Sequence, residues 1–420
     1  IIMKRFSFIP IAALFLGSAL SGGCSDSDST PDSKQPDKPE KFELKERQDI
    51  NLDSRQKAGV ELQNDFAFKF FNADAEEGNS IVSPISLTTC LSMVANGASD
   101  VVKEEIVNTL LPAGASLTDL NTLNKYLTEE LSEADNSSTL ILSNSVWCHN
   151  TYTLSGGFTN ALADSYKATA FSLDIHTKAA AEKINNWVNT STNGLIPKIY
   201  DTAPEGDLSI INTMYFKGEW CTPFDAALTK SDNFTNADGS KTSLPFMTSE
   251  LRLRDMVRTS DYTIVRLPYG NQAFSCYLLL PAENTSATLG ASDWNALKNK
   301  MKEEEVIIIL PKFEMEHTVE KMNEKVAKAG VKTLFTDSDA LMNTTVPSIS
   351  GAVAMRHKTA FKVSEQGAEG AGMTESILLT FDPNSGGTVP TEVKFDRPFK
   401  FIIEEQSTGA IILMGYVTKL

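Results

Sequence analysis

The sequence is poor in the residues that bind metals. Its 420 residues include four histidines and five cysteines, and none lies at a metal-ligand spacing such as CxxC or HExxH. We therefore expect neither a metal site nor a cofactor. Basic residues are also in the minority, with 38 Lys and Arg against 54 Asp and Glu, a formal net charge of -16. Because proteins bind polyanions through clustered Lys and Arg, nucleic acid is not an expected partner.

No hydrophobic run is long enough to span a bilayer comfortably. From Met3 the chain has a basic front, an apolar stretch and then small residues, which is typical of a secretory signal peptide. Cys24, which follows Leu20-Ser21-Gly22-Gly23, resembles the cysteine of a bacterial lipobox, which is lipidated after cleavage. We expect residues 1–24 to be a signal peptide and Cys24 to anchor the protein to the outer membrane. The acidic run Ser25–Asp28 resembles an export tag of surface lipoproteins, whereas simple secretion is the alternative.

Residues 25–55 are largely polar, acidic and rich in proline, so they cannot bury enough apolar surface to fold. We interpret them as a disordered tether. From residue 56 to 420 no linker or repeat interrupts the pattern, and 41% hydrophobic with 22% charged residues over the whole chain is typical of a globular protein. The remaining cysteines are far apart, and we interpret them as small buried hydrophobic residues without a disulfide framework: Cys90, Cys148, Cys221 and Cys276.

Hydrophobic periodicity predicts helices in the first half and strands in the second. Val60–Asn72 places aromatic residues on one helical face, and Ile85–Ala98 follows Ser83-Pro84, a favourable helix start. The continuous run Ile307–Ile309 predicts a strand covered on both faces. Further strands are predicted at Leu140–Trp147, Leu208–Phe216, Tyr262–Leu267, Phe274–Leu280, Val306–Leu310, Ala360–Val363, Phe399–Ile403 and Ile411–Val417. The fold class is therefore α+β with large sheets.

One segment, residues 367–390, fits neither pattern. It begins with small and polar residues, is apolar in the middle and ends rich in glycine. A loop of about two dozen residues inside a compact domain is normally functional or disordered. Its charges are sorted, because Glu369 and Glu375 fall in the set opposite to the uncharged one. That uncharged set comprises Ala368, Gly370, Gly372, Thr374, Ser376, Leu378 and Thr380.

Several segments resemble one known family in its order along the chain. HKTAFKVSEQGAEGAG (357–372) and EVKFDRPFKFIIEEQSTGAIILMGYV (392–417) resemble the reactive-loop region and C-terminal strands of serpins. Further matches are NSIVSPISL (79–87), ANGA (95–98), INNWVNTSTNGLI (184–196), INTMYFKGEWCTPFD (211–225) and LPKF (310–313). The resemblance implies the serpin fold, an α+β architecture of three β-sheets and eight or nine helices with an exposed reactive-centre loop.

The resemblance also assigns roles to residues. The hinge, where the loop begins to enter the main sheet, comprises Gly367, Ala368, Glu369, Gly370, Ala371 and Gly372. The breach, where the loop enters the sheet, comprises Glu365, Lys312 and Trp220. The shutter, a polar cluster beneath the strands that part, comprises Ser83, Ser86, Asn212 and His357. The reactive bond is expected between Phe381 and Asp382, with Leu379 and Thr380 as alternative residues before the bond.

The implied function is suicide-substrate inhibition of serine proteases, with papain-like cysteine proteases as a further target class. The target's own nucleophile forms the acyl-enzyme, so we expect no catalytic residues in this chain. A hydrolase triad built from Ser83 or Ser86 with His357 is disfavoured because no GxSxG elbow surrounds either serine. A non-inhibitory serpin that binds or carries a ligand is the alternative function.

The loop composition also predicts target class. Phe381 suits a chymotrypsin-like pocket, and Leu379 or Thr380 suits elastase-like pockets. Arg and Lys are absent from residues 367–392, so trypsin-like proteases are not expected targets. We expect a monomer, whose physiological protease the sequence does not identify.

Overall fold

The computed structural model describes residues 43–420 with gaps at 77, 284–287, 352, 354 and 369–390. The residues from Leu44 to Leu420 form one compact unit. Several predictions fall outside the described residues: the signal peptide, lipidation of Cys24, most of the tether, the reactive bond and the hinge residues after Ala368. Within the described part, no helix is both long and apolar enough to cross a bilayer.

Most helices lie in the first half of the chain, as predicted. The described residues form eight α-helices: α1 (Ser54–Ala75), α2 (Pro84–Ala95), α3 (Asp100–Leu110), α4 (Leu117–Glu133), α5 (Gly156–Tyr166), α6 (Lys178–Ser191), α7 (Ala291–Lys298) and α8 (Met322–Ala329). Two short 3-10 helices occur at Ala226–Leu228 and Thr333–Phe335. Helix α1 begins with a capping box between Asp53 and Gln56.

The strands form three sheets. The largest has the order β1 (Ser80–Val82), β18 (Ile411–Val417), β17 (Phe399–Glu405), β10 (Phe274–Pro281), β9 (Tyr262–Pro268), β8 (Arg252–Arg258), β11 (Lys302–Pro311), β7 (Lys241–Thr248) and β6 (Lys230–Thr235), with β16 (Thr391–Lys394) paired to β11. The second has the order β12 (Phe313–Thr318), β14 (Lys358–Ser364), β15 (Gly367–Ala368), β5 (Leu208–Glu219), β2 (Ser138–His149) and β4 (Thr169–Leu173). The third pairs β13 (Thr345–Val346) with β3 (Thr153–Leu154).

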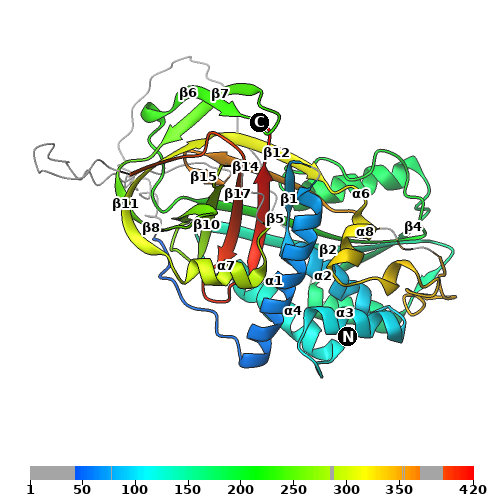
Figure 1. The fold of residues 1–420 in the computed structure, drawn as a ribbon. Helices are drawn as coiled ribbons and strands as arrows, with labels where there is room; N and C mark the ends of the chain where they lie inside the picture. Colours follow the sequence, from blue (N-terminus) through cyan, green and yellow to red (C-terminus); the bar gives the residue numbers. More distant parts are fainter. Residues whose placement is uncertain (1–42, 77, 284–287, 352, 354, 369–390) are drawn as a thin grey trace, which may run out of the picture. The chain divides into compact units, whose positions relative to one another are not determined.

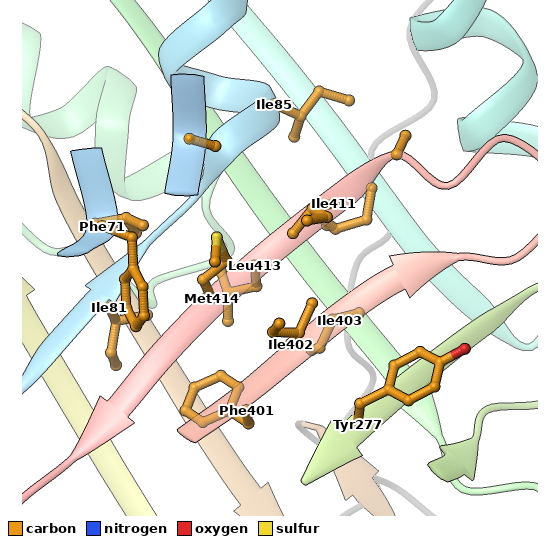
Figure 2. Packing of buried hydrophobic residues seen from close by; sticks show 14 of the residues in the cluster. Phe71, Ile81, Ile85, Tyr277, Phe401, Ile402, Ile403, Ile411, Leu413 and Met414 are labelled. Carbon is orange, nitrogen blue, oxygen red and sulfur yellow. The ribbon is translucent and has the colours of Figure 1, made fainter. Parts of the chain in front are cut away.

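The largest of three apolar clusters in the described residues joins the two large sheets to several of the helices. Strands β17 and β18 are buried along most of their length, and α1 and α2 lie beside β18 (Figure 1). Phe401 and Ile403 from β17 lie near Leu413 from β18, while Phe71 of α1 packs from the helical side (Figure 2). Phe401 also stacks on Phe361 of β14 with ring centroids 4.9 Å apart, which ties the two large sheets together.

Three expectations about segments need correction. Helix α2 ends at Ala95 because Asn96 caps it, not at Ala98. In the run Ile307–Ile309 the burial alternates, because only one face of β11 is fully covered by the rest of the protein. The tether does not extend to residue 55: Ile50 and Leu52 are buried, and the Ile50 amide donates to Ser407 Oγ at 2.9 Å. The segment from residue 44 onward is therefore part of the folded unit.

The described cysteines are free, as expected, but they are not all buried. Cys148 and Cys276 are buried and Cys90 is half-buried. Cys221 is exposed, because it follows β5 at the point where the chain leaves the sheet. The interpretation as buried hydrophobic residues was therefore wrong for Cys221.

Candidate functional site

The short strand β15 lies between two long strands that are far apart in the sequence. Gly367 and Ala368 pair with Ser364 and Val363 of β14 on one side, and with Glu219 and Gly218 of β5 on the other, antiparallel to both. Gly367 has φ +145°, and a Cβ on it would overlap the carbonyl oxygen of Gly218. Only glycine fits there.

Below β15 the two neighbouring strands continue without pairing to each other in the described residues. The other edge of β14 is paired with β12, and the other edge of β5 is paired with β2. At the lower end of this gap lies a cavity of about 540 Å³, whose lining includes Ser86, Asn212, His357 and Lys358. Among the described residues, only Gly367 and Ala368 therefore lie between β14 and β5, at the top of the sheet.

The three predicted breach residues meet at the top of this opening. The Trp220 amide donates to the Gln366 carbonyl at 2.8 Å, and its Nε1 donates to the Ser364 carbonyl at 3.0 Å. The Trp220 ring stacks on Tyr269 with centroids 4.5 Å apart. Trp220 therefore fixes the turn from which β15 begins.

Glu365 is buried in this turn, with Lys312 Nζ 2.8 Å from one carboxylate oxygen. Thr229 Oγ1 donates to the other oxygen at 3.0 Å. Burial acts to raise the pKa of Glu365, but the hydrogen bonds from Lys312 and Thr229 hold it below its usual value. The pair is not a solvated surface contact, so removing Lys312 would leave a buried carboxylate without its cation.

The four predicted shutter residues also come together, beneath the gap. The Ser83 amide donates to His357 Nε2 at 3.1 Å, and the Ser83 hydroxyl donates to the Ile412 carbonyl at 2.9 Å. Ser86 Oγ hydrogen-bonds Asn212 Oδ1, and the Ser86 amide donates to Ser83 Oγ at 3.3 Å. The cluster therefore links α2 to the two strands that border the opening.

Comparison with known families matches residues 61–420 to the family described as "Serpin (serine protease inhibitor)". The chain belongs to the serpin family. Among similar proteins, Iripin-2 of Ixodes ricinus is 29% identical over 377 residues, covering 86% of this chain and 93% of that relative.

Solved serpin structures agree with the fold. The thermophilic serpin tengpin in its native state has a TM-score of 0.75 at 29% identity, covering 90% of this chain and 98% of its own. Human thyroxine-binding globulin complexed with thyroxine has a TM-score of 0.77 at 23% identity, covering 87% of this chain and 99% of its own. The second likeness shows the fold alone. The predicted serpin fold is confirmed.

The geometry of this serpin gives no support to a hydrolase triad. His357 Nε2 accepts its hydrogen bond from the Ser83 main chain, and the Ser83 hydroxyl points to the Ile412 carbonyl instead. Ser86 hydrogen-bonds Asn212 and not His357. Neither serine is therefore oriented toward a general base.

The sequence analysis missed residues that extend the shutter. Asn212 Nδ2 donates to Asn144 Oδ1 at 2.7 Å, and Thr359 Oγ1 lies 3.1 Å from His357 Nε2. Asp74 is buried, and its carboxylate accepts a hydrogen bond from the Ser80 hydroxyl. His317 Nε2 lies 2.7 Å from Asp74 Oδ2, and Lys325 Nζ donates to Asp74 Oδ1 at 2.9 Å. A signal for Asp74 was present, since it lies four residues after Phe70 on the buried face of α1.

Acidification should weaken the shutter through His357. Burial lowers the pKa of His357 to about 4, so the imidazole is neutral in the folded protein and Nε2 can accept from Ser83. The unfolded chain takes up this proton near pH 6.5, so it binds more protons than the folded chain between about pH 4 and pH 6.5. We predict that the free energy of unfolding falls by about 3 kcal/mol as the pH decreases across that window.

Urea unfolding of the wild type and of His357→Gln, at several pH values between 4 and 7, measures this effect. Gln retains a hydrogen-bond acceptor but does not titrate, so its stability should fall less over the same range. Equal pH dependence of the two proteins would show that His357 is not the responsible group. Asp74, whose pKa is lowered, contributes its own loss only below its usual value of 3.8 and so outside this window.

Proposed function

We propose that this serpin is a suicide-substrate inhibitor of serine proteases, and that its cleaved reactive loop inserts between β5 and β14. The observation that supports the proposal is the position of β15, which pairs antiparallel with both strands at the top of the opening. Main-chain hydrogen-bonding groups along an open strand edge favour pairing with a further strand. Insertion would extend β15 downward into the existing gap.

The register of β15 fixes where each loop residue would lie. Because Ala368 is opposite Gly218 and Val363, each further loop residue moves one position back along β5 and β14. Thr374 would then lie opposite Asn212 and His357, at the shutter. Ala368 itself is 1% exposed, so the predicted inward set starts on the buried face.

In this register the charged and glycine residues of the loop would lie at positions that favour insertion. Glu369 would lie between Lys217 and Lys362, on the outward face, where a carboxylate is attracted to both cations. Gly370 would lie between Phe216 and Phe361, both of which are buried. A glycine there would leave room for the two rings. This would offset the destabilisation of about 0.5–1 kcal/mol that glycine causes in a strand relative to alanine.

The chemistry required is supplied by the target. Its serine hydroxyl attacks the carbonyl of the reactive bond, the amine side leaves, and an ester to the target remains. Insertion then carries the ester-linked protease away from the hinge before water completes hydrolysis. This chain supplies the bait and the open sheet, and we propose no catalytic group of its own.

A non-inhibitory carrier remains the alternative function, and the cavity of about 540 Å³ is the observation that favours it. Volumes of this size accommodate small ligands in other proteins. A carrier would be cleaved in the loop without trapping the protease, so the same experiment separates the two functions.

We further propose that the monomer is anchored to the outer membrane through lipid on Cys24. The support is the sequence alone, namely the signal-like segment and the small residues before Cys24. The folded domain begins near residue 44, so residues 25–43 would link it to the lipid anchor.

The proposal predicts SDS-stable complexes with chymotrypsin-like or elastase-like proteases. Ala368 is already buried where the inserted strand would begin, so the guanidinium of Ala368→Arg would oppose burial of β15 and of the residues that would follow it into the sheet. Trapping should therefore fail while cleavage continues. Glu369→Gln, at the next position and expected on the outward face of an inserted strand, serves as the matched control and should still trap. Gel analysis after incubation with each protease measures both products. If Ala368→Arg trapped protease as efficiently as the wild type, insertion at this site would be wrong.

The second prediction concerns the bond that is cut. Cleavage after Phe381, or after Leu379 or Thr380, should release a C-terminal peptide that begins between Thr380 and Asp382. Trypsin should form no stable complex, because the loop offers no basic residue to its pocket. Mass spectrometry of the released peptide locates the bond. A new N-terminus elsewhere would refute the bond assignment, and a stable trypsin complex would refute the predicted specificity.

A further inference from the structure

Strand β8 carries three arginines on one side of its backbone, and they differ sharply in burial. Arg252, Arg254 and Arg258 alternate along the strand and therefore share one face. Arg258 is exposed, whereas Arg254 is 8% exposed and ranks among the buried residues. A buried guanidinium in a protein normally has an anionic or strongly hydrogen-bonding partner.

Arg254 has no such partner among the described residues. Its Nε is buried without a hydrogen-bond acceptor, and so is the Nε of Arg252 two residues away. Burial and the charge of Arg252 lower the pKa of Arg254 to about 10, and only Cys221 acts in the opposite direction. Each of the two guanidinium groups therefore keeps an unsatisfied Nε donor, and Arg254 also lacks a carboxylate partner among the described residues.

Three carboxylates on or beside β8 already have other partners. Glu304 lies directly opposite Arg254 in the ladder but pairs with Arg258, with 3.8 Å between Nη1 and Oε2. Asp255 Oδ2 forms an ion pair with Arg266 Nη1 at 2.7 Å, and Glu250 Oε2 forms one with Arg252 Nη2 at 2.7 Å.

Each of these carboxylates is thus committed to another arginine. Arg254 is left without one in the described part of the chain.

We infer that Arg254 and Arg252 form a binding site for a tetrahedral oxyanion, phosphate or sulfate. The planar guanidinium fork offers paired N–H donors that match such oxygens, and one tetrahedral anion can accept from two forks at once. The exposed Cys221, which the charges of Arg254 and Arg252 reach, marks the side open to solvent. A bound anion would neutralise the buried charge that the protein itself leaves uncompensated.

The site lies close to the hinge. Cys221 directly follows Trp220, whose amide holds the Gln366 carbonyl one residue before β15. The Cys221 amide in turn donates to the Pro268 carbonyl at 2.9 Å. An anion bound at this position would therefore lie beside the end of β5, and its binding would not depend on whether the loop traps a protease.

Thermal unfolding of the full chain tests the site. Inorganic phosphate or sulfate at 50 mM should raise the apparent melting temperature by about 2–5 °C over chloride at equal ionic strength. In Arg254→Met this rise should be lost. The variant should also melt above the wild type in chloride, because it removes an unpaired buried charge. Arg55→Met, an exposed arginine of α1 outside this cluster, is the matched control and should keep the anion response.

Equal responses of the wild type and Arg254→Met to phosphate, or no response in the wild type, would overturn the inference. So would a lower melting temperature of Arg254→Met in chloride, since that indicates a structural role for the guanidinium.

A second measurement needs no substitution. Alkylation of Cys221 by iodoacetamide, followed by mass spectrometry of its peptide, should slow at least twofold in phosphate relative to chloride at equal ionic strength. An anion between the arginines both covers the thiol and removes the positive charge that favours the thiolate. Alkylation at the same rate in both salts would contradict a site beside Cys221. Because it follows one peptide, this readout does not depend on protease trapping.

Discussion

The structure depends on one constraint: in the described part of the chain, two long strands of one sheet lie side by side without pairing to each other. Strands β5 and β14 are paired on their outer edges, and the described residues between them are Gly367 and Ala368 at the top. Main-chain N–H and C=O groups in a sheet normally hydrogen-bond to the neighbouring strands. Two facing strand edges that lack this pairing can therefore accept a further strand between them. Trp220 and Glu365 hold the top of this opening, and the Ser83–His357 cluster lies at its base.

These two polar clusters explain how the opening persists. At the top, Lys312 and Thr229 compensate the buried Glu365, so the turn into β15 has a single favoured arrangement. At the base, His357 must stay neutral to accept from the Ser83 main chain, and burial ensures that it does. Each cluster connects elements that would have to move apart if the sheet expanded. In the proposed mechanism they would stabilise the sheet before insertion and set how readily it accepts another strand.

Much of this could be predicted from the sequence, because apolar periodicity and family motifs are local. The strands at Tyr262–Pro268 and Ile411–Val417 follow from their hydrophobic runs, and the shutter and breach follow from the resemblance. Polar strands such as Lys230–Thr235 escaped prediction because they bury few side chains. The burial of Asp74 and Arg254 depends on which distant elements cover them, and composition carries no record of that. The exposure of Cys221 has the same origin.

Our central proposal is that the intact protein is kinetically trapped with an open sheet and becomes more stable once the loop can enter it. Thermal unfolding before and after a single protease nick between residues 376 and 390 tests this most directly. The account predicts a much higher melting temperature for the nicked protein, with both fragments still associated, because the released strand gains partners on β5 and β14. Identical melting temperatures for the intact and nicked proteins would contradict it.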